Sequence, residues 1–174
     1  MAFDPVHFVP ASGKEALLAL PVRLIRAAGH GQNANINHWC LYLSTGPGTS
    51  VRIDCTPSYH VPSTVLSGGS KANIVISRLP CATSQSAIKV FDLTVRQNLT
   101  VADVYNILLQ NSRHKYEFDR NGVGCRCWTS EQLDLLKENQ VVTNPQEVAA
   151  AKAGILKLWP EGTPLGLDQG AYYQ

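Results

Sequence analysis

The segment "HWCLYLSTGPGTSVRIDCT" (residues 38–56) decides the fold class. Residues 38–43 and 51–56 are rich in aromatic, aliphatic and β-branched side chains that alternate with smaller or polar ones, a pattern typical of strands. The residues between them are mostly Gly, Pro, Ser and Thr, a composition typical of a turn. The sequence therefore predicts a β-hairpin over residues 38–56.

A symmetrical pairing of this hairpin places Leu43 opposite Val51. Because side chains alternate along a strand and opposite residues share a face, the hairpin then has one apolar and one ionisable face. The apolar face carries Trp39, Leu41, Leu43, Val51, Ile53 and Cys55, and the other carries His38, Cys40, Tyr42, Arg52, Asp54 and Thr56. In this register His38 and Asp54 are diagonal neighbours, close enough for an Asp–His pair. The alternative is that this face is only the solvated side of a two-layer sheet.

The rest of the chain changes from strand patterns to helix patterns. Further strands are predicted near residues 22–27, 73–79 and 88–95, the last two consistent with a second hairpin, while residues 29–37 read as a polar loop. Helices are predicted after Thr100 and after Asn144, each an N-cap residue, and over the amphipathic run that follows Cys125. Strands followed by helices predict an α+β fold, with an antiparallel sheet packed against helices.

The chain length fits one domain over residues 1–174, with a core at about 15–160 and a loose C-terminal extension at 160–174. The net charge is only +2 and Lys and Arg do not cluster, so a nucleic-acid partner is not expected. No apolar run is long enough to span a bilayer, and the N-terminus lacks the pattern of a signal peptide. We therefore expect a cytoplasmic protein with reduced thiols; its oligomeric state stays open.

The stretch "GVGCRCW" (residues 122–128) places two cysteines at the predicted start of a helix. A helix N-terminus stabilises a thiolate, and its free amides can hold an oxyanion. If Trp128 and Leu133 point into the core, Cys125 faces outward more than Cys127 does, although Cys127 stays a candidate. The alternative is that both are small core residues. The cysteines form no CxxC pair, so no metal site is expected, nor is any cofactor.

The order of a His strand, an acidic strand and a later Cys helix resembles the permuted papain-like thiol enzymes of the NlpC/P60 type. Lecithin retinol acyltransferase-like proteins and PPPDE-type peptidases belong to that group. "HWCLYLSTGPGTSVRIDCTPSY" (38–59) resembles the His-strand pattern of the acyltransferases, with Asp54 at a position where they use histidine. "YEFDRNGVGCRCWTSEQLDLL" (116–136) resembles the segment that carries their nucleophile. The motifs also resemble fungal proteins with an "NHW" strand, described only by a domain of unknown function.

The resemblance implies a circularly permuted papain-like fold and a Cys–His–Asp enzyme. Cys125 would be the nucleophile, His38 the general base and Asp54 the residue that orients His38. The substrate would be a small molecule or acyl compound with an amide, ester or thioester, and the fungal likeness implies a biosynthetic step, which includes covalent addition to an unsaturated substrate. Residues expected near the substrate or its oxyanion are Asn35, Asn37, Trp39, Tyr116, Arg126 and Trp128. The alternatives are a non-catalytic binding or scaffold protein and a peptidase acting on a protein modifier.

Overall fold

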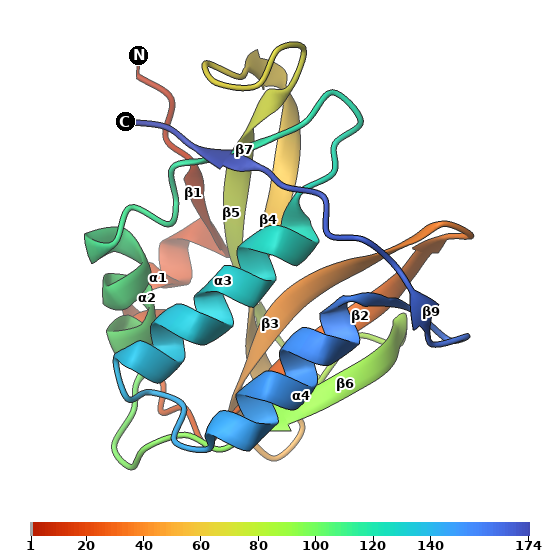
Figure 1. The fold of residues 1–174 in the computed structure, drawn as a ribbon. Helices are drawn as coiled ribbons and strands as arrows, with labels where there is room; N and C mark the ends of the chain where they lie inside the picture. The colour runs from red at the N-terminus through yellow and green to blue at the C-terminus, as the bar shows by residue number, and fades with distance from the viewer. Residues whose placement is uncertain (1) are drawn as a thin grey trace.

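A computed structural model describes residues 2–174 and shows a mixed α+β protein built on one large sheet (Figure 1). The helices are η1 (Ala11–Gly13, 3₁₀), α1 (Lys14–Leu18), α2 (Val101–Gln110), α3 (Cys125–Glu138) and α4 (Pro145–Ile155). The longer strands are β2 (Leu24–Asn33), β3 (Ile36–Gly46), β4 (Thr49–Pro62), β5 (Ser70–Leu79) and β6 (Ala87–Leu93). The short strands are β1 (Val6–Val9), β7 (Tyr116–Phe118), β8 (Lys157–Leu158), β9 (Thr163–Pro164) and β10 (Ala171–Tyr172).

The main sheet has eight strands in the order β10-β7-β5-β4-β3-β2-β6, with β1 also paired to β5. The β1–β5 pair is parallel and all the other pairs in this sheet are antiparallel. Strands β8 and β9 form a separate small pair. The predicted α+β class with a largely antiparallel sheet is confirmed.

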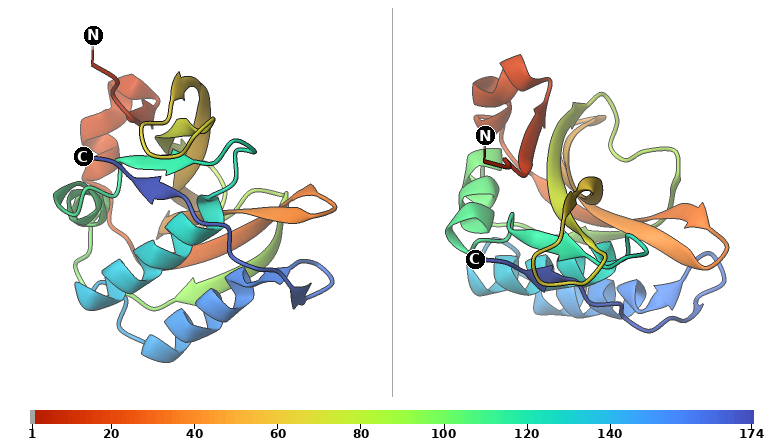
Figure 2. Two further views of the ribbon diagram at one scale, coloured as in Figure 1. Left: turned by 45° about the horizontal axis from the view of Figure 1, so that its top comes forward. Right: turned by 90° about the horizontal axis from the view of Figure 1, so that it is seen from above.

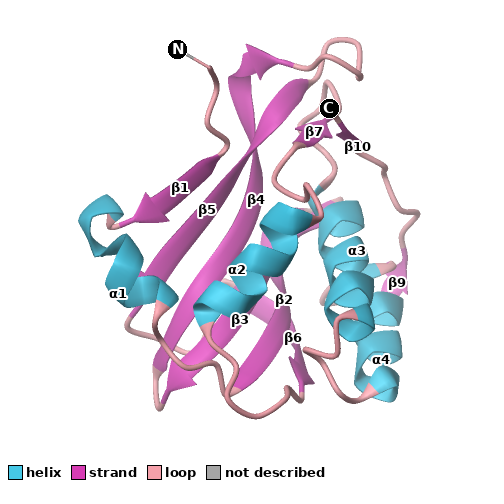
Figure 3. Ribbon diagram, turned by 90° about the vertical axis from the view of Figure 1, so that its left-hand side faces the viewer, coloured by secondary structure: helices cyan, strands magenta, loops and turns pink. Residues whose placement is uncertain are grey.

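Helices α3 and α4 run side by side against one face of this sheet, while α1 and α2 pack together at one side (Figures 1 and 3). The side chains between α3 and the sheet are fully buried, among them Trp39, Leu41 and Ile53 from the sheet and Trp128 and Leu136 from α3. The Thr129 hydroxyl of α3 donates to the carbonyl oxygen of Trp39 at 3.3 Å. The apolar face of the predicted hairpin is therefore the core face.

The β3–β4 hairpin has the predicted register, with Leu43 opposite Val51. Its ladder runs from the turn only as far as the pair Leu41–Ile53. Beyond that pair β3 stays with β2 and β4 stays with β5, so the two halves of the sheet diverge, and α3 begins at the opening between them (Figure 1). Helix α3 packs on the core face of the sheet. Because the strands diverge, its first residues can reach side chains of the opposite, ionisable face through the opening.

The prediction of a polar loop at residues 29–37 is wrong, because β2 and β3 continue through it as a long hairpin. Backbone pairing outweighs the polar composition here, and Gly29 is required by its partner: a Cβ at Gly29 would lie 2.8 Å from the Trp39 ring. The second hairpin expected from residues 73–79 and 88–95 is also absent among the described residues. Strand β6 pairs instead with β2, which buries Leu93 in the core.

The segment between β5 and β6 therefore crosses the face of the sheet opposite α3 and α4 (Figure 2, right). It is held there by the Ser50 hydroxyl, which donates to the Cys81 carbonyl at 2.7 Å, and by the Ser84 amide, which donates to the Tyr42 hydroxyl at 3.4 Å. Tyr42 and Cys40 are buried beneath this segment. The ionisable face is thus covered at one end and open at the other.

The two N-caps predicted from sequence are confirmed. Thr100 and Asp103 form a reciprocal capping box at α2, and the Asn144 side chain accepts from the Gln146 amide at α4. The expected loose extension is wrong: β10 pairs with β7, and the Tyr172 ring packs against Tyr116 at 4.9 Å between centroids. Apolar and hydrogen-bonding side chains thus fix the segment to the sheet. Of the helices within residues 2–174, none is long and apolar enough to cross a membrane.

Candidate functional site

His38 and Asp54 meet where β3 and β4 diverge. The Nε2 atom of His38 lies 2.6 Å from Asp54 Oδ1, a short hydrogen bond between two partly buried side chains. Both residues lie on the ionisable face that the hairpin register predicts, and their side chains approach diagonally across the opening. Because Nε2 is bound to Asp54, the other ring nitrogen, Nδ1, is left for a second partner.

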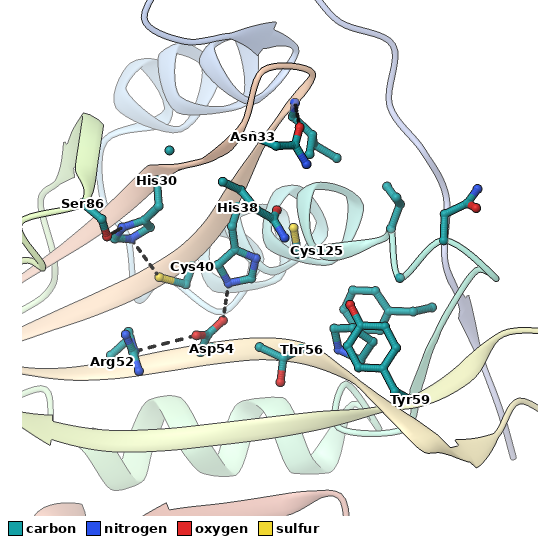
Figure 4. A pocket seen from close by; sticks show the side chains of 18 residues that line it. His30, Asn33, His38, Cys40, Arg52, Asp54, Thr56, Tyr59, Ser86 and Cys125 are labelled. Carbon is teal, nitrogen blue, oxygen red and sulfur yellow. Dashed lines mark hydrogen bonds and ion pairs between the residues drawn. The ribbon is translucent and has the colours of Figure 1, made fainter.

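Cys125 is the first residue of α3 and lines the same pocket as His38 and Asp54. Its sulfur lies beside the His38 ring, on the other side of the ring from Asp54 (Figure 4). Gly124 precedes the helix and provides no side-chain cap, so the first amides of α3 have no side-chain acceptor from the N-cap residue. The site thus combines a thiol, an imidazole, a carboxylate and the positive end of a helix.

The charge state of His38 follows from these partners. Burial alone would lower the pKa of the imidazole, but hydrogen bonds and charges from Asp54 and Cys125 outweigh it and raise the pKa of His38 to about 10. The ring is therefore an imidazolium at neutral pH. An imidazolium beside a thiol favours the thiolate form, which is the nucleophilic one.

The pocket has a volume of about 480 Å³ and extends to both sides of His38. One side is polar and includes His30, Arg52 and Ser86, and the other includes Pro57, Tyr59, Phe118 and Val123. Arg52 and Tyr59 lie on opposite sides of the His38–Asp54 pair (Figure 4). The size and the mixture of lining groups suit a small organic molecule that spans the cysteine.

A second histidine cluster lies at the polar side and was not predicted. His30 Nδ1 is 2.9 Å from the Ser86 hydroxyl, and its Nε2 is 3.4 Å from the Cys40 sulfur and 3.2 Å from the Tyr42 hydroxyl. Burial and the nearby His38 charge lower the pKa of His30 to about 4, so this ring is neutral at pH 7. His30 lies opposite His38 in the β2–β3 pairing. A strand prediction for residues 29–37 would have placed the two histidines side by side, but the loop prediction did not.

Two residues form the other wall at the mouth of the pocket. Tyr59 is 75% exposed and has a positive φ of 61°, an uncommon conformation for a residue with a bulky side chain. Gly122 has φ 69°, and a Cβ there would lie 2.7 Å from the Tyr59 hydroxyl. The positive φ and the close approach of Tyr59 both favour glycine at position 122. The "NGVG" motif pointed to a close approach of the backbone, but nothing in the sequence pointed to Tyr59.

The β4–β5 connection, which follows the strand that carries Tyr59, is anchored by Glu117. This fully buried carboxylate accepts hydrogen bonds from the Ser63 hydroxyl, the Thr64 amide and hydroxyl at 2.7 Å, and the Val65 amide at 2.8 Å. Burial opposes ionisation, but the four donors prevail and lower the pKa of Glu117 to about 2. The β4–β5 connection is thus held by a buried charge.

The six residues expected near the substrate do not line this pocket. Trp39 and Trp128 are fully buried in the core, and the Trp128 Nε1 donates to the Arg113 carbonyl at 2.9 Å. The Tyr116 hydroxyl donates to the Gly124 carbonyl at 3.0 Å, which supports the turn before α3. Their role is to build the scaffold beneath the site.

The remaining three of the six also have structural partners. The Asn37 side chain exchanges two hydrogen bonds with the backbone of Trp159, at 2.7 and 2.9 Å. Asn35 is exposed at the β2–β3 turn, where its amide donates to the Asn33 side chain. Arg126 is 1% exposed and donates to the carbonyl oxygens of Ile155, Leu165 and Gly166 at 2.6–2.9 Å. Arg126 therefore anchors the C-terminal segment.

The two cysteines of "CRC" have different surroundings. Cys125 lines the pocket, whereas Cys127 is buried beside Tyr116 and Glu131 and does not line it. Burial raises the pKa of the Cys127 thiol, and the neighbouring Glu131 charge adds to this. Of the two, only Cys125 shares a pocket with His38. Within residues 2–174 no group of three or more His, Cys, Asp or Glu side chains is arranged to hold a metal ion.

Comparison with known proteins places residues 23–173 in one family, described as a domain of unknown function (DUF7770). The matched segment includes His38, Asp54 and Cys125, and all of the pocket residues. The comparisons with curated proteins and with solved structures give no match. Because the match covers most of the chain, the protein belongs to the DUF7770 family.

Proposed function

We propose that the protein is a cysteine-dependent hydrolase or acyltransferase that acts on the carbonyl of an amide, ester or thioester. The observation that carries this proposal is the position of His38, which is bound to Asp54 through Nε2 at 2.6 Å and has the Cys125 thiol beside its ring in one pocket. Cys125 is the nucleophile, His38 the general acid and base, and Asp54 the residue that orients His38.

The proposed reaction begins from the ion pair of the Cys125 thiolate and the His38 imidazolium. The thiolate sulfur attacks the carbonyl carbon, and the resulting oxyanion accepts hydrogen bonds from the backbone amides at the start of α3. The His38 imidazolium then donates its proton to the leaving amine, alcohol or thiol, and an acyl-thioester forms at Cys125. A water or another acyl acceptor, deprotonated by His38, then attacks this thioester. The acyl product leaves, and the Cys125 thiolate and the His38 imidazolium are restored.

The fold proposed for this chemistry is the circularly permuted papain-like one of the NlpC/P60 type. It is supported by the order along the chain, in which the His strand and the Asp strand precede the Cys helix. It is also supported by the packing of α3 on the antiparallel sheet with its first residue at the sheet opening. The family likeness concerns the arrangement of the site and says nothing about the substrate.

The test is the modification of single cysteines by iodoacetamide at pH 7, followed by peptide mass spectrometry. Cys125 is expected to react fastest among the five cysteines, including the partly exposed Cys81, because its thiolate is stabilised by His38. A His38→Gln variant should slow labelling of Cys125 and leave that of Cys81 unchanged. Labelling of Cys125 no faster than Cys81, and indifferent to His38→Gln, would instead favour a non-catalytic binding protein.

A further inference from the structure

Arg52 is the one arginine among the residues that line the pocket. It lies on β4 two residues before Asp54, so both side chains lie on the same face. The Arg52 Nε atom is 3.8 Å from Asp54 Oδ2, beyond hydrogen-bond distance, and within residues 2–174 this buried nitrogen has no hydrogen-bond partner.

Asp54, the carboxylate nearest to Arg52, already binds another cation, His38. Asp54 Oδ1 forms the 2.6 Å bond with His38, and His38 is charged. The remaining groups at this end are neutral: His30 has a lowered pKa, Ser86 supplies a hydroxyl, and the Tyr42 hydroxyl is a hydrogen-bond partner of the Arg52 guanidinium. Asp54 thus lies between His38 and Arg52, and the guanidinium, whose Nε has no partner, is left with more hydrogen-bonding capacity than the described residues satisfy.

A guanidinium with 30% of its side chain exposed toward a pocket is suited to a planar oxyanion. The fork of N–H groups matches both oxygens of a carboxylate, which makes charge-assisted hydrogen bonds stronger than those between neutral groups. Two residues along a strand span about 7 Å, so a group bound at Arg52 would be only a few bonds from a carbonyl held at the Asp54 level.

We propose that Arg52 is a specificity-determining residue that binds a carboxylate of the substrate, with the scissile carbonyl at Cys125 and the remaining part of the molecule toward Tyr59. This inference rests on the proposed function and narrows its substrate class to acyl compounds with a carboxylate near the reacting bond. N-acyl amino acids and short peptides that end in a free carboxylate have this chemistry.

The test compares two chloroacetyl probes that differ only in charge. N-chloroacetylglycine carries a carboxylate and N-chloroacetylglycinamide carries an amide, while the carbon attacked by the thiolate is the same. In the wild-type protein the acid should modify Cys125 about tenfold faster than the amide, as expected for one charge-assisted contact. Arg52→Gln should remove this preference, and Arg52→Lys should keep part of it because the charge remains without the fork.

The matched control is Arg78→Gln, which removes the same charge from an exposed position on the neighbouring strand β5. It should leave the acid-to-amide ratio unchanged. If Arg52→Gln instead slows both probes equally, Arg52 serves only to position Asp54 and the substrate proposal is overturned. An acid no faster than the amide in the wild-type protein overturns it as well.

A second measurement separates this proposal from the proposed catalysis. Binding of N-acetylglycine and N-acetylglycinamide, which contain no reactive chlorine, is measured by calorimetry on the wild-type and Arg52→Gln proteins. Selective binding of the acid that is lost in Arg52→Gln supports the carboxylate site even if Cys125 proves unreactive to every probe. Equal or absent binding of the two compounds, with a reactive Cys125, overturns the carboxylate site and leaves the thiol chemistry standing.

Discussion

Two cysteine–histidine pairs lie in the same pocket, and strand β3 contributes to both. Cys125 pairs with His38 of β3, and Cys40 of β3 pairs with His30. The two rings are 6.5 Å apart between centroids, so the surroundings differ over a very short distance. The pKa of His38 is raised to about 10, whereas that of His30 is lowered to about 4.

The difference between the pairs comes from their third partners. His38 has a carboxylate, Asp54, on its other nitrogen, while His30 has the neutral Ser86 hydroxyl. Burial and the nearby Asp54 charge raise the pKa of the Cys40 thiol, and the positive charge of Arg52 offsets them only in part. Proximity of sulfur to imidazole therefore does not make a nucleophile, and the carboxylate and the helix start distinguish the two sites.

The largest expected difference follows from removing each thiol in turn. Cys125→Ala should lower turnover of p-nitrophenyl acetate by about a thousandfold or more, since the covalent step is lost. Cys40→Ala removes a buried, protonated thiol and should change turnover less than about threefold. Thermal unfolding of both variants provides the control for folding. Equal losses in the two variants would contradict the assignment of Cys125.

The difference between the pKa values of His38 and His30 is tested by replacing Asp54, the carboxylate partner of His38. Asp54→Asn removes the charge that holds His38 protonated, so the pKa of His38 should fall from about 10 toward its ordinary value near 6.5. Labelling of Cys125 at pH 7 should then slow by about 10- to 100-fold, while the pKa of His30 stays low. Histidine NMR titrations measure both rings. A His38 that still titrates near 10 would show that Asp54 is not its controlling partner.

The two histidines should also give stability slopes of opposite sign. The pKa of His30 is lower in the folded state, so its neutral form stabilises the fold above pH 6.5, and this contribution, roughly 3 kcal/mol, is lost as pH falls to 4. The pKa of His38 is higher in the folded state, so its contribution is present below pH 6.5 and is lost as pH rises through 10.

Urea unfolding of two variants across this pH range measures these slopes. His30→Gln should flatten the curve of unfolding free energy below pH 6.5, and His38→Gln should flatten it above that pH. A curve for His30→Gln that keeps the acid slope of the wild type would place the responsible group elsewhere.

The smallest expected effect concerns the pocket mouth at Tyr59, which gives access to the Cys125–His38 pair and not to the His30 cluster. Gly122→Ala introduces a methyl group 2.7 Å from the Tyr59 hydroxyl at a positive φ, and should cost about 1 kcal/mol of unfolding free energy. Because Tyr59 is exposed and can move, the pocket mouth near Cys125 should change and the His30 cluster should not. Labelling of Cys125 should shift by a few fold, with the NMR signals of His30 unaltered. Gly48→Ala, at a similar positive φ of 66° where a Cβ meets nothing within 4 Å, is the matched control.

The fold could be predicted where local patterns and tertiary pairing agree. The β3–β4 register and the caps at Thr100 and Asn144 depend on neighbouring residues and were predicted correctly. The extension of β2 and β3 through residues 29–37 depends on strand pairing and on Gly29 beneath Trp39, which composition does not reveal. The pairing of β6 with β2 is equally non-local, because β5 and β6 are adjacent only along the chain.

In the candidate site, the alternation of the hairpin placed His38 and Asp54 on one face, and the structure brings them together with Cys125. The residues expected near the substrate are aromatic, arginine and asparagine side chains close to the motifs in sequence. Their orientation depends on partners far along the chain, such as Trp159 for Asn37 and Ile155 for Arg126. Tyr59 and His30 reach the pocket for the same reason, through contacts that no local pattern encodes.

The anchor formed by Arg126 has a consequence for synthesis of the chain. Its guanidinium bonds to the Gly166 carbonyl, 40 positions later, so these acceptors emerge from the ribosome well after the helix that carries Cys125. A buried charge without acceptors is costly, and the start of α3 therefore lacks its final setting until the C-terminal segment is added. The proposed thiolate site would thus be completed only after the C-terminal segment has joined the fold.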